Sequence, residues 1–68
     1  MADKNMIRGA IVRNGYTIGS FAEALGITRY TLSKKINGKS EFRASEIEKS
    51  CSLLGIAKKD VGKYFFAM

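Results

Sequence analysis

Residues 17–40, TIGSFAEALGITRYTLSKKINGKS, decide the fold of this chain. Apolar residues recur there at helical spacing in two short segments, which predicts helices over 18–25 and 29–37. Gly26 lies between the segments, where a tight turn needs a residue that tolerates positive φ. Ala22 has the small side chain that lets the second helix cross the first closely. Together these features predict a helix–turn–helix unit.

Each of these two helices begins at a threonine. Thr17 and Thr28 stand where a side-chain hydroxyl accepts a hydrogen bond from an amide of the first helical turn. Apolar residues are sparse in the second helix, and we expect Leu32 and Ile36 to anchor it against the first. The residue three after Leu32 is Lys35, which is not apolar. The four-residue spacing of the two anchors therefore sets which face of this helix is exposed.

The rest of the chain also has the features of short helices. Asp3 is a candidate N-cap for a helix over 3–14. Ser45 and Glu48 have the spacing of a capping box and predict the start of a fourth helix. A fifth short helix is expected over 58–68. No segment alternates apolar and polar residues as a strand does, so we predict a single all-α domain of five helices.

Composition excludes several classes of function. The chain has one cysteine and no histidine, which excludes an internal disulfide, a Cys/His zinc site and His-assisted catalysis. Cys51 is expected to be a small core residue. No apolar run approaches the roughly 20 residues that a membrane-spanning helix needs, and the N-terminus does not resemble a signal peptide. We therefore expect a cytoplasmic protein without catalytic residues, cofactor, metal or membrane partner.

Charge is the most informative feature of the composition. Twelve Lys and Arg residues against six Asp and Glu residues give a net charge of +6. Between Arg29 and Arg43 the chain has five Lys or Arg residues and a single acidic one, Glu41. A small domain with its positive charge gathered in one helix and the following loop is expected to bind a polyanion, and nucleic acid is the first candidate.

Residues 17–40 resemble the helix–turn–helix of the Cro/CI-type phage repressors, the XRE-like group. The remaining segments are similar to the outer helices of that family's compact five-helix, lambda-repressor-like domain. At Lys35 this chain departs from the family, which usually has an apolar residue there. The resemblance implies a sequence-specific regulator of transcription that binds double-stranded DNA. It also implies a repressor, which would act by occluding a promoter.

Position in the helix–turn–helix then indicates a role for each exposed polar residue. The second helix of such a unit enters the major groove with its N-terminal turns leading. The base-contacting residues are expected to be Arg29, Tyr30, Ser33 and Lys34. Phosphate contacts are expected from the two helix caps and from the region after the second helix, namely Thr17, Thr28, Asn37, Lys39 and Arg43.

A module of this size contacts few base pairs, so useful specificity favours two copies on a palindromic operator. We expect a homodimer that forms in solution or only on DNA. Three consecutive aromatic residues, Tyr64, Phe65 and Phe66, cannot all face inward from one short helix. Phe66 and Met68 are therefore candidate dimer contacts.

Two other kinds of protein remain open at this point. The first is a protein-binding module, such as an antirepressor that uses the same fold to bind a repressor. The second is a basic protein that binds a membrane surface or RNA, although its charge should follow one long amphipathic face, which this sequence lacks. An enzyme is the class that the sequence favours least, because its acidic residues are scattered.

Overall fold

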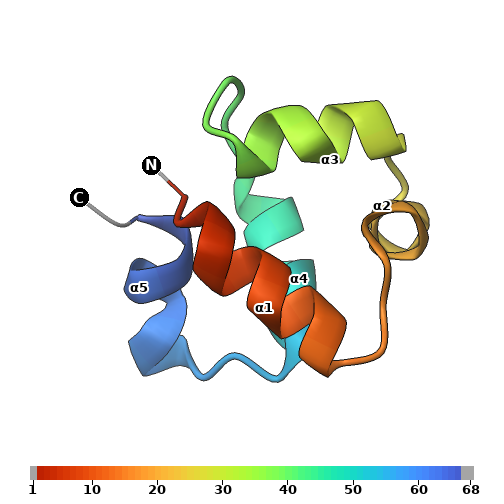
Figure 1. Cartoon of the computed structure of the whole chain (residues 1–68). Coiled ribbons are helices and arrows are strands. Elements are labelled where there is room, and N and C mark those ends of the chain that lie inside the picture. Colours follow the sequence, from red (N-terminus) through yellow and green to blue (C-terminus); the bar gives the residue numbers. More distant parts are fainter. Residues whose placement is uncertain (1, 67–68) are drawn as a thin grey trace.

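The computed structural model describes residues 2–66, and this part of the chain contains five α-helices and no strand. The helices are α1 (Lys4–Arg13), α2 (Ile18–Leu25), α3 (Arg29–Ile36), α4 (Ala44–Leu54) and α5 (Val61–Phe65), and a 3-10 turn, η1 (Lys58–Asp60), precedes α5 (Figure 1). The expectation of an all-α fold with five helices is confirmed. No helix within residues 2–66 is long and apolar enough to cross a bilayer.

The first three helices begin at the caps that the sequence indicates. The Asp3 carboxylate accepts hydrogen bonds from the amides of Asn5 and Met6, both at 3.1 Å. Thr17 and Ser20 cap each other, because each side-chain oxygen accepts from the other residue's amide, at 3.0 and 2.9 Å. Each such cap contributes about 1 kcal/mol to stability, so these helix starts are encoded locally.

The turn between α2 and α3 is closed by Gly26, whose φ is 78°. Its amide donates to the carbonyl of Glu23, and the amide of Ile27 donates to the carbonyl of Ala22, both at 3.0 Å. These two bonds form a Schellman motif, which requires a left-handed residue at the position of Gly26. Ala22 itself is 1% exposed, as the close crossing of α2 and α3 demands.

The fourth helix corrects one sequence-based expectation. The Ser45–Glu48 capping box is wrong, because α4 begins at Ala44 with Arg43 as its N-cap. Glu46 reaches back and accepts the amide hydrogen bond of Arg43 at 2.8 Å. A carboxylate at this position satisfies the N-cap amide whatever the N-cap side chain is, so Arg43 needs no capping oxygen of its own.

The C-terminal region is shorter and less regular than the single helix expected over 58–68. It consists of η1 followed by the five-residue helix α5, and residues 67–68 lie outside the described part of the chain. The first residues of the chain hold this region in place, because the amide of Asp3 donates to the carbonyl of Tyr64 at 2.8 Å.

One core joins the helices. Figure 1 shows α3 along one side of the molecule, with α5 on a different side of α1. The buried apolar side chains come from all five helices, and they are Ile7, Ala10, Ile11, Phe21, Ala22, Leu25, Leu32, Ile36, Leu54 and Phe65. Leu32 and Ile36 are 0% and 1% exposed, so they anchor α3 as expected. Burying each of these larger side chains contributes about 1.5–3 kcal/mol.

Candidate nucleic-acid interface

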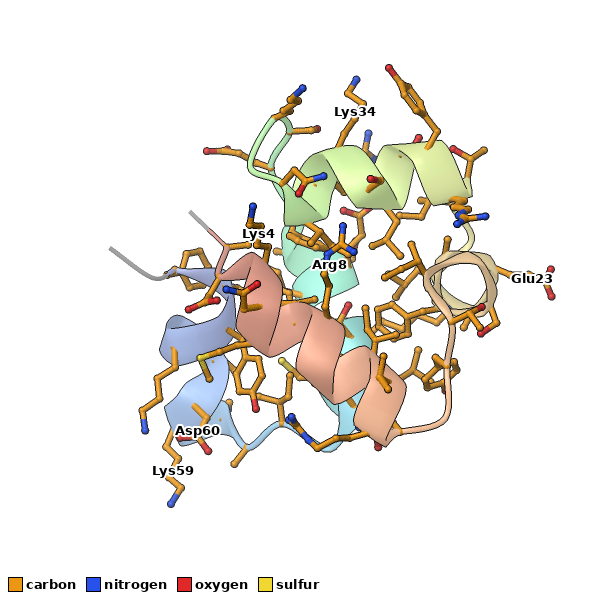
Figure 2. The ribbon with its side chains drawn as sticks, in the orientation of Figure 1. Lys4, Arg8, Glu23, Lys34, Lys59 and Asp60 are labelled. Carbon is orange, nitrogen blue, oxygen red and sulfur yellow. The ribbon has the colours of Figure 1, made fainter. Side chains whose placement is uncertain are left out.

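The face of α3 opposite its two anchors is exposed and basic. Tyr30 and Lys34 lie on it, and Tyr30 is 73% exposed, while Arg29 is exposed at the N-terminal end of α3. The Lys34 ammonium lies 5.4 Å from the centre of the Tyr30 ring, in a cation–π contact that helps to order both side chains. Figure 2 shows Lys34 extending from α3 away from the body of the protein. A cation and an aromatic residue are thus presented together on one turn of α3.

Ser33 is less available than the other expected base contacts. Its side chain is half-buried, and its hydroxyl accepts a hydrogen bond from the Asn37 amide at 3.4 Å. Asn37 follows α3 as its C-cap and is exposed. The structure therefore brings Ser33 and Asn37 together at the end of α3, with Asn37 on the outside.

Arg29 lies against the N-terminus of α2 as well as at the start of α3. A Cβ atom on Gly19 would lie 3.9 Å from both the Arg29 Cδ and the Thr17 Oγ1. The guanidinium stem, the Thr17 hydroxyl and the first-turn amides of α2 are therefore neighbours. Helix N-termini and arginine both favour anions, so this place suits a phosphate oxygen.

Thr28 is exposed at the N-terminus of α3. Its hydroxyl oxygen accepts the amide hydrogen bond of Thr31 at 3.1 Å and lies 2.9 Å from the Thr31 hydroxyl, to which it is hydrogen bonded. Its capping role is confirmed, and its phosphate contact stays a prediction.

Lys39 and Arg43, the two cations expected to bind phosphate beyond α3, lie in and just after the loop that connects α3 to α4. Both side chains are exposed. The amide of Lys39 donates to the carbonyl of Lys34 at 2.9 Å, which fixes Lys39 directly beyond the end of α3. Arg43 is the N-cap of α4. The loop thus carries one cation at each end, next to the cationic face of α3.

Lys35, which the charge pattern groups with these cations, is buried instead. It is 6% exposed, and its ammonium forms an ion pair with Glu46 at 2.5 Å. Hydrogen bonds from Lys35 and from the Arg43 amide, with the nearby positive charges, outweigh the effect of burial and lower the pKa of Glu46 below its ordinary value. The exposed cations of α3 and its loop are therefore Arg29, Lys34, Lys39 and Arg43, and none of them forms an ion pair within residues 2–66.

The aromatic tail is divided between the core and the surface. Phe65 is 4% exposed, whereas Phe66 is 59% exposed, so one aromatic residue does face outward as expected. Phe66 lies at the edge of a mainly apolar groove that α4 and the region around α5 form, lined also by Ile47, Cys51 and Val61. Burial raises the pKa of the Cys51 thiol, which packs partly buried against the core. Met68 lies outside the described residues.

Two features of this site are missing from the sequence-based assignment. One is the pairing of Lys35 with Glu46, for which the signal was a lysine at an inward helical position that needs a buried acceptor. The other is the contribution of α1, because Figure 2 shows Lys4 and Arg8 extending from α1 on the side where α3 lies. Among residues 2–66 there is no cluster of three or more metal-ligating side chains.

Comparison with known proteins identifies the family of this chain but assigns it no function. No curated protein matches the chain closely enough to count as a relative. One family model, described as "Protein of unknown function (DUF739)", matches residues 1–68, which is the whole sequence. A match over the full length is sufficient to place the chain, and the protein with this cationic helix–turn–helix belongs to the DUF739 family.

Proposed function

We propose that this protein is a sequence-specific regulator of transcription that binds double-stranded DNA in the cytoplasm of a bacterium or of a phage-infected host. The observation that carries the proposal is the exposed face of α3 and its loop. Four cations without ion-pair partners in the described structure gather there, while Leu32 and Ile36 fix the opposite face of the helix. A rigid cationic face of this kind suits the negative field of a duplex.

The dimensions of α3 suit the major groove. Eight residues make a helix about 12 Å long, and a helix of about 10–12 Å diameter enters a groove about 12 Å wide. With α3 seated there, Arg29, Tyr30 and Lys34 face the base edges, and an arginine or lysine reads the O6 and N7 atoms of guanine. Lys39 and Arg43 then lie beside the phosphates that follow.

The mechanism is repression by occlusion. A bound copy on an operator that overlaps a promoter excludes the polymerase from the same DNA. The regulator resembles the Cro/CI-type phage repressors in its helix–turn–helix sequence, and that resemblance supports this mechanism over activation.

A second copy of the chain binds beside the first. The groove that ends at Phe66 has Glu48 on one helix and Lys58 on η1 among its lining residues. In a two-fold interface the same patch of both copies meets, and we propose that each Glu48 pairs with the partner's Lys58 across it. Sedimentation of the free protein and of its operator complex tests this pairing. Two copies on the operator are expected, and Phe66→Ser is expected to weaken the pairing; a monomer in both states contradicts it.

Selection of bound sequences from a random oligonucleotide pool tests the regulator itself. We expect a palindrome whose half-sites are about one helical turn apart, with retention that falls steeply as salt rises. The control is the same selection with an Arg29→Ala, Lys34→Ala double variant. Retention without any enriched sequence contradicts a specific regulator. No retention, together with binding to a repressor protein, favours an antirepressor.

A further inference from the structure

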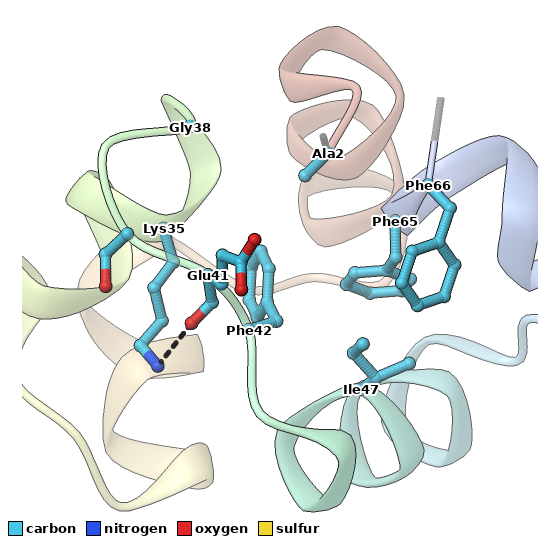
Figure 3. A pocket seen from close by; sticks show the side chains of 9 residues that line it. Ala2, Lys35, Gly38, Glu41, Phe42, Ile47, Phe65 and Phe66 are labelled. Carbon is cyan, nitrogen blue, oxygen red and sulfur yellow. Dashed lines mark hydrogen bonds between the residues drawn. The ribbon is translucent and has the colours of Figure 1, made fainter. Parts of the chain in front are cut away.

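A buried lysine connects α3, the helix proposed to contact DNA bases, to the loop that follows it. The side chain of Lys35 leaves the inward face of α3, and its ammonium donates to the carbonyl of Glu41 at 3.1 Å and to the carboxylate of Glu46 at 2.5 Å. Figure 3 shows Lys35 reaching the backbone of the loop at Glu41. The side chains of Lys35 and Glu46 are only 7% and 12% exposed.

Both partners of Lys35 belong to the stretch that carries Lys39 and Arg43. The same Glu46 oxygen that binds Lys35 also accepts the amide hydrogen bond of Arg43 at 2.8 Å. Between the two attachment points, Phe42 packs edge-on against Phe65 with 5.1 Å between ring centres. The loop backbone is therefore fixed at Glu41, Phe42 and Arg43 in succession.

Stability does not account for an ion pair at this place. Removing two charges from water is costly, and apolar side chains of similar volume often replace a buried pair without loss of stability. A methionine at position 35 would fill nearly the same space. An apolar residue cannot supply directional hydrogen bonds. Only the ammonium and the carboxylate hold the carbonyl of Glu41 and the amide of Arg43 at set places.

We propose that Lys35 and Glu46 are positioning residues for DNA recognition. They hold the loop with Lys39 and Arg43 in a fixed relation to α3, so that the phosphate contacts of the loop and the base contacts of α3 form together. This inference rests on the proposed DNA-binding function. It assigns to the pair a role in affinity without contact with DNA.

A double variant, Lys35→Met with Glu46→Gln, tests the proposal in the full-length protein. The glutamine oxygen still accepts the Arg43 amide, and the methionine fills the core, so the melting temperature should stay within about 5 °C of the parent. Operator affinity at 0.15 M salt should fall about tenfold. The plot of log affinity against log salt should become shallower by about 2, the loss of two phosphate contacts.

The charge-reversed variant, Lys35→Glu with Glu46→Lys, shows whether an ion pair at these positions is sufficient or whether its hydrogen bonds to the loop backbone are needed. It keeps an ion pair, but a carboxylate at position 35 cannot donate to the Glu41 carbonyl, and an ammonium at position 46 cannot accept from the Arg43 amide. We expect the same loss of affinity as in the first variant. Binding at parental strength and parental salt slope by this variant overturns the proposal.

Hydrogen exchange without DNA separates the two proposals. In the charge-reversed variant, where position 46 cannot accept its hydrogen bond, the Arg43 amide should exchange faster than in the parent, while amides in the middle of α1 stay protected. The matched control removes the exposed pair at the other end, Asp60→Asn with Lys63→Met, and should change neither binding nor loop exchange. Unchanged exchange of the Arg43 amide in the charge-reversed variant overturns the positioning role even if the parent binds DNA. A parent that binds no DNA overturns the proposed function instead.

Discussion

The protein has two basic ends, and they differ in how their cations are held. Arg29, Lys34, Lys39 and Arg43 lie on α3 and its loop, and Lys58, Lys59 and Lys63 lie on η1 and α5. Figure 2 shows Lys34 at one end of the molecule and Lys59 with Asp60 at the other. At the second end Asp60 lies 3.5 Å from Lys63 and offsets part of the charge.

Anchoring is the larger difference between the two ends. Helix α3 buries Leu32, Lys35 and Ile36, whereas the five-residue α5 buries Phe65 alone and η1 buries none. A cation contributes to specific recognition only when its backbone is fixed relative to the DNA. The position of the basic residues on the fold, rather than their number, therefore favours α3 and its loop as the proposed interface.

The largest expected effect comes from removing the cations of α3. Arg29→Ala with Lys34→Ala should reduce operator preference about 100-fold or more, since each guanine contact supplies about 1–3 kcal/mol of discrimination. Gel shifts on operator and scrambled DNA measure the ratio. Lys59→Ala with Lys63→Ala is the matched control at the other end and should leave the ratio unchanged. Equal losses in both pairs would break the distinction between the two ends.

Removing the cations of the loop should have a smaller effect of a different kind. Lys39→Ala with Arg43→Ala should weaken binding about tenfold on every sequence and make the salt dependence shallower by about 2. Titrations at several salt concentrations measure both quantities on operator and random DNA. A change in the preferred sequence would instead place one of these side chains against a base.

A core substitution separates stability from binding. The Ser50 hydroxyl is fully buried in α4 and has no hydrogen-bond partner within the described residues. Ser50→Ala should stabilise the fold by about 1 kcal/mol, since it removes an unpaired polar group and favours the helix. Thermal unfolding should show a melting temperature about 4–8 °C higher. DNA affinity should not change, and a loss of binding would mean that Ser50 shapes the interface.

The smallest expected effect is on acid stability. The pKa of Glu46 is lower in the folded protein than its ordinary value near 4.5. The stabilisation that Glu46 supplies is therefore complete above about pH 4.5 and is lost as pH falls through the lowered folded pKa. Urea unfolding between pH 7 and pH 3 measures it. The Glu46→Gln variant should lose less stability over this range, whereas Asp60→Asn at the other end should follow the parent closely.

Most of the fold could be read from local signals. The bounds of α2 and the start of α3 follow from Thr17, Gly26 and Thr28, because a cap or a left-handed turn needs only its nearest neighbours in the chain. The start of α4 could not be read in this way. Both Ser45–Glu48 and Arg43–Glu46 have a carboxylate three residues after a possible N-cap. The structure uses the second pair, in which Glu46 also contacts Lys35.

The candidate site divides in the same way. The exposed positions of Tyr30 and Lys34 follow from the helical period once Leu32 and Ile36 are identified as anchors, whereas Arg29 is exposed at the first position of α3. The burial of Lys35 does not follow, because it depends on a partner elsewhere in the chain, Glu46. A side chain's charge indicates what it can bind, but only its surroundings decide whether solvent reaches it.

By itself, the sequence determined that the chain is all-helical, where α2 and α3 begin, and that positive charge gathers between residues 29 and 43. Those properties depend on residues a few positions apart. The tertiary structure alone decided that Lys35 is buried, and so is not part of the exposed basic surface, and that it pairs with a carboxylate eleven residues later. It also decided that Phe66, and not Phe65, is exposed. Burial depends on which helices pack together, and no local pattern specifies that.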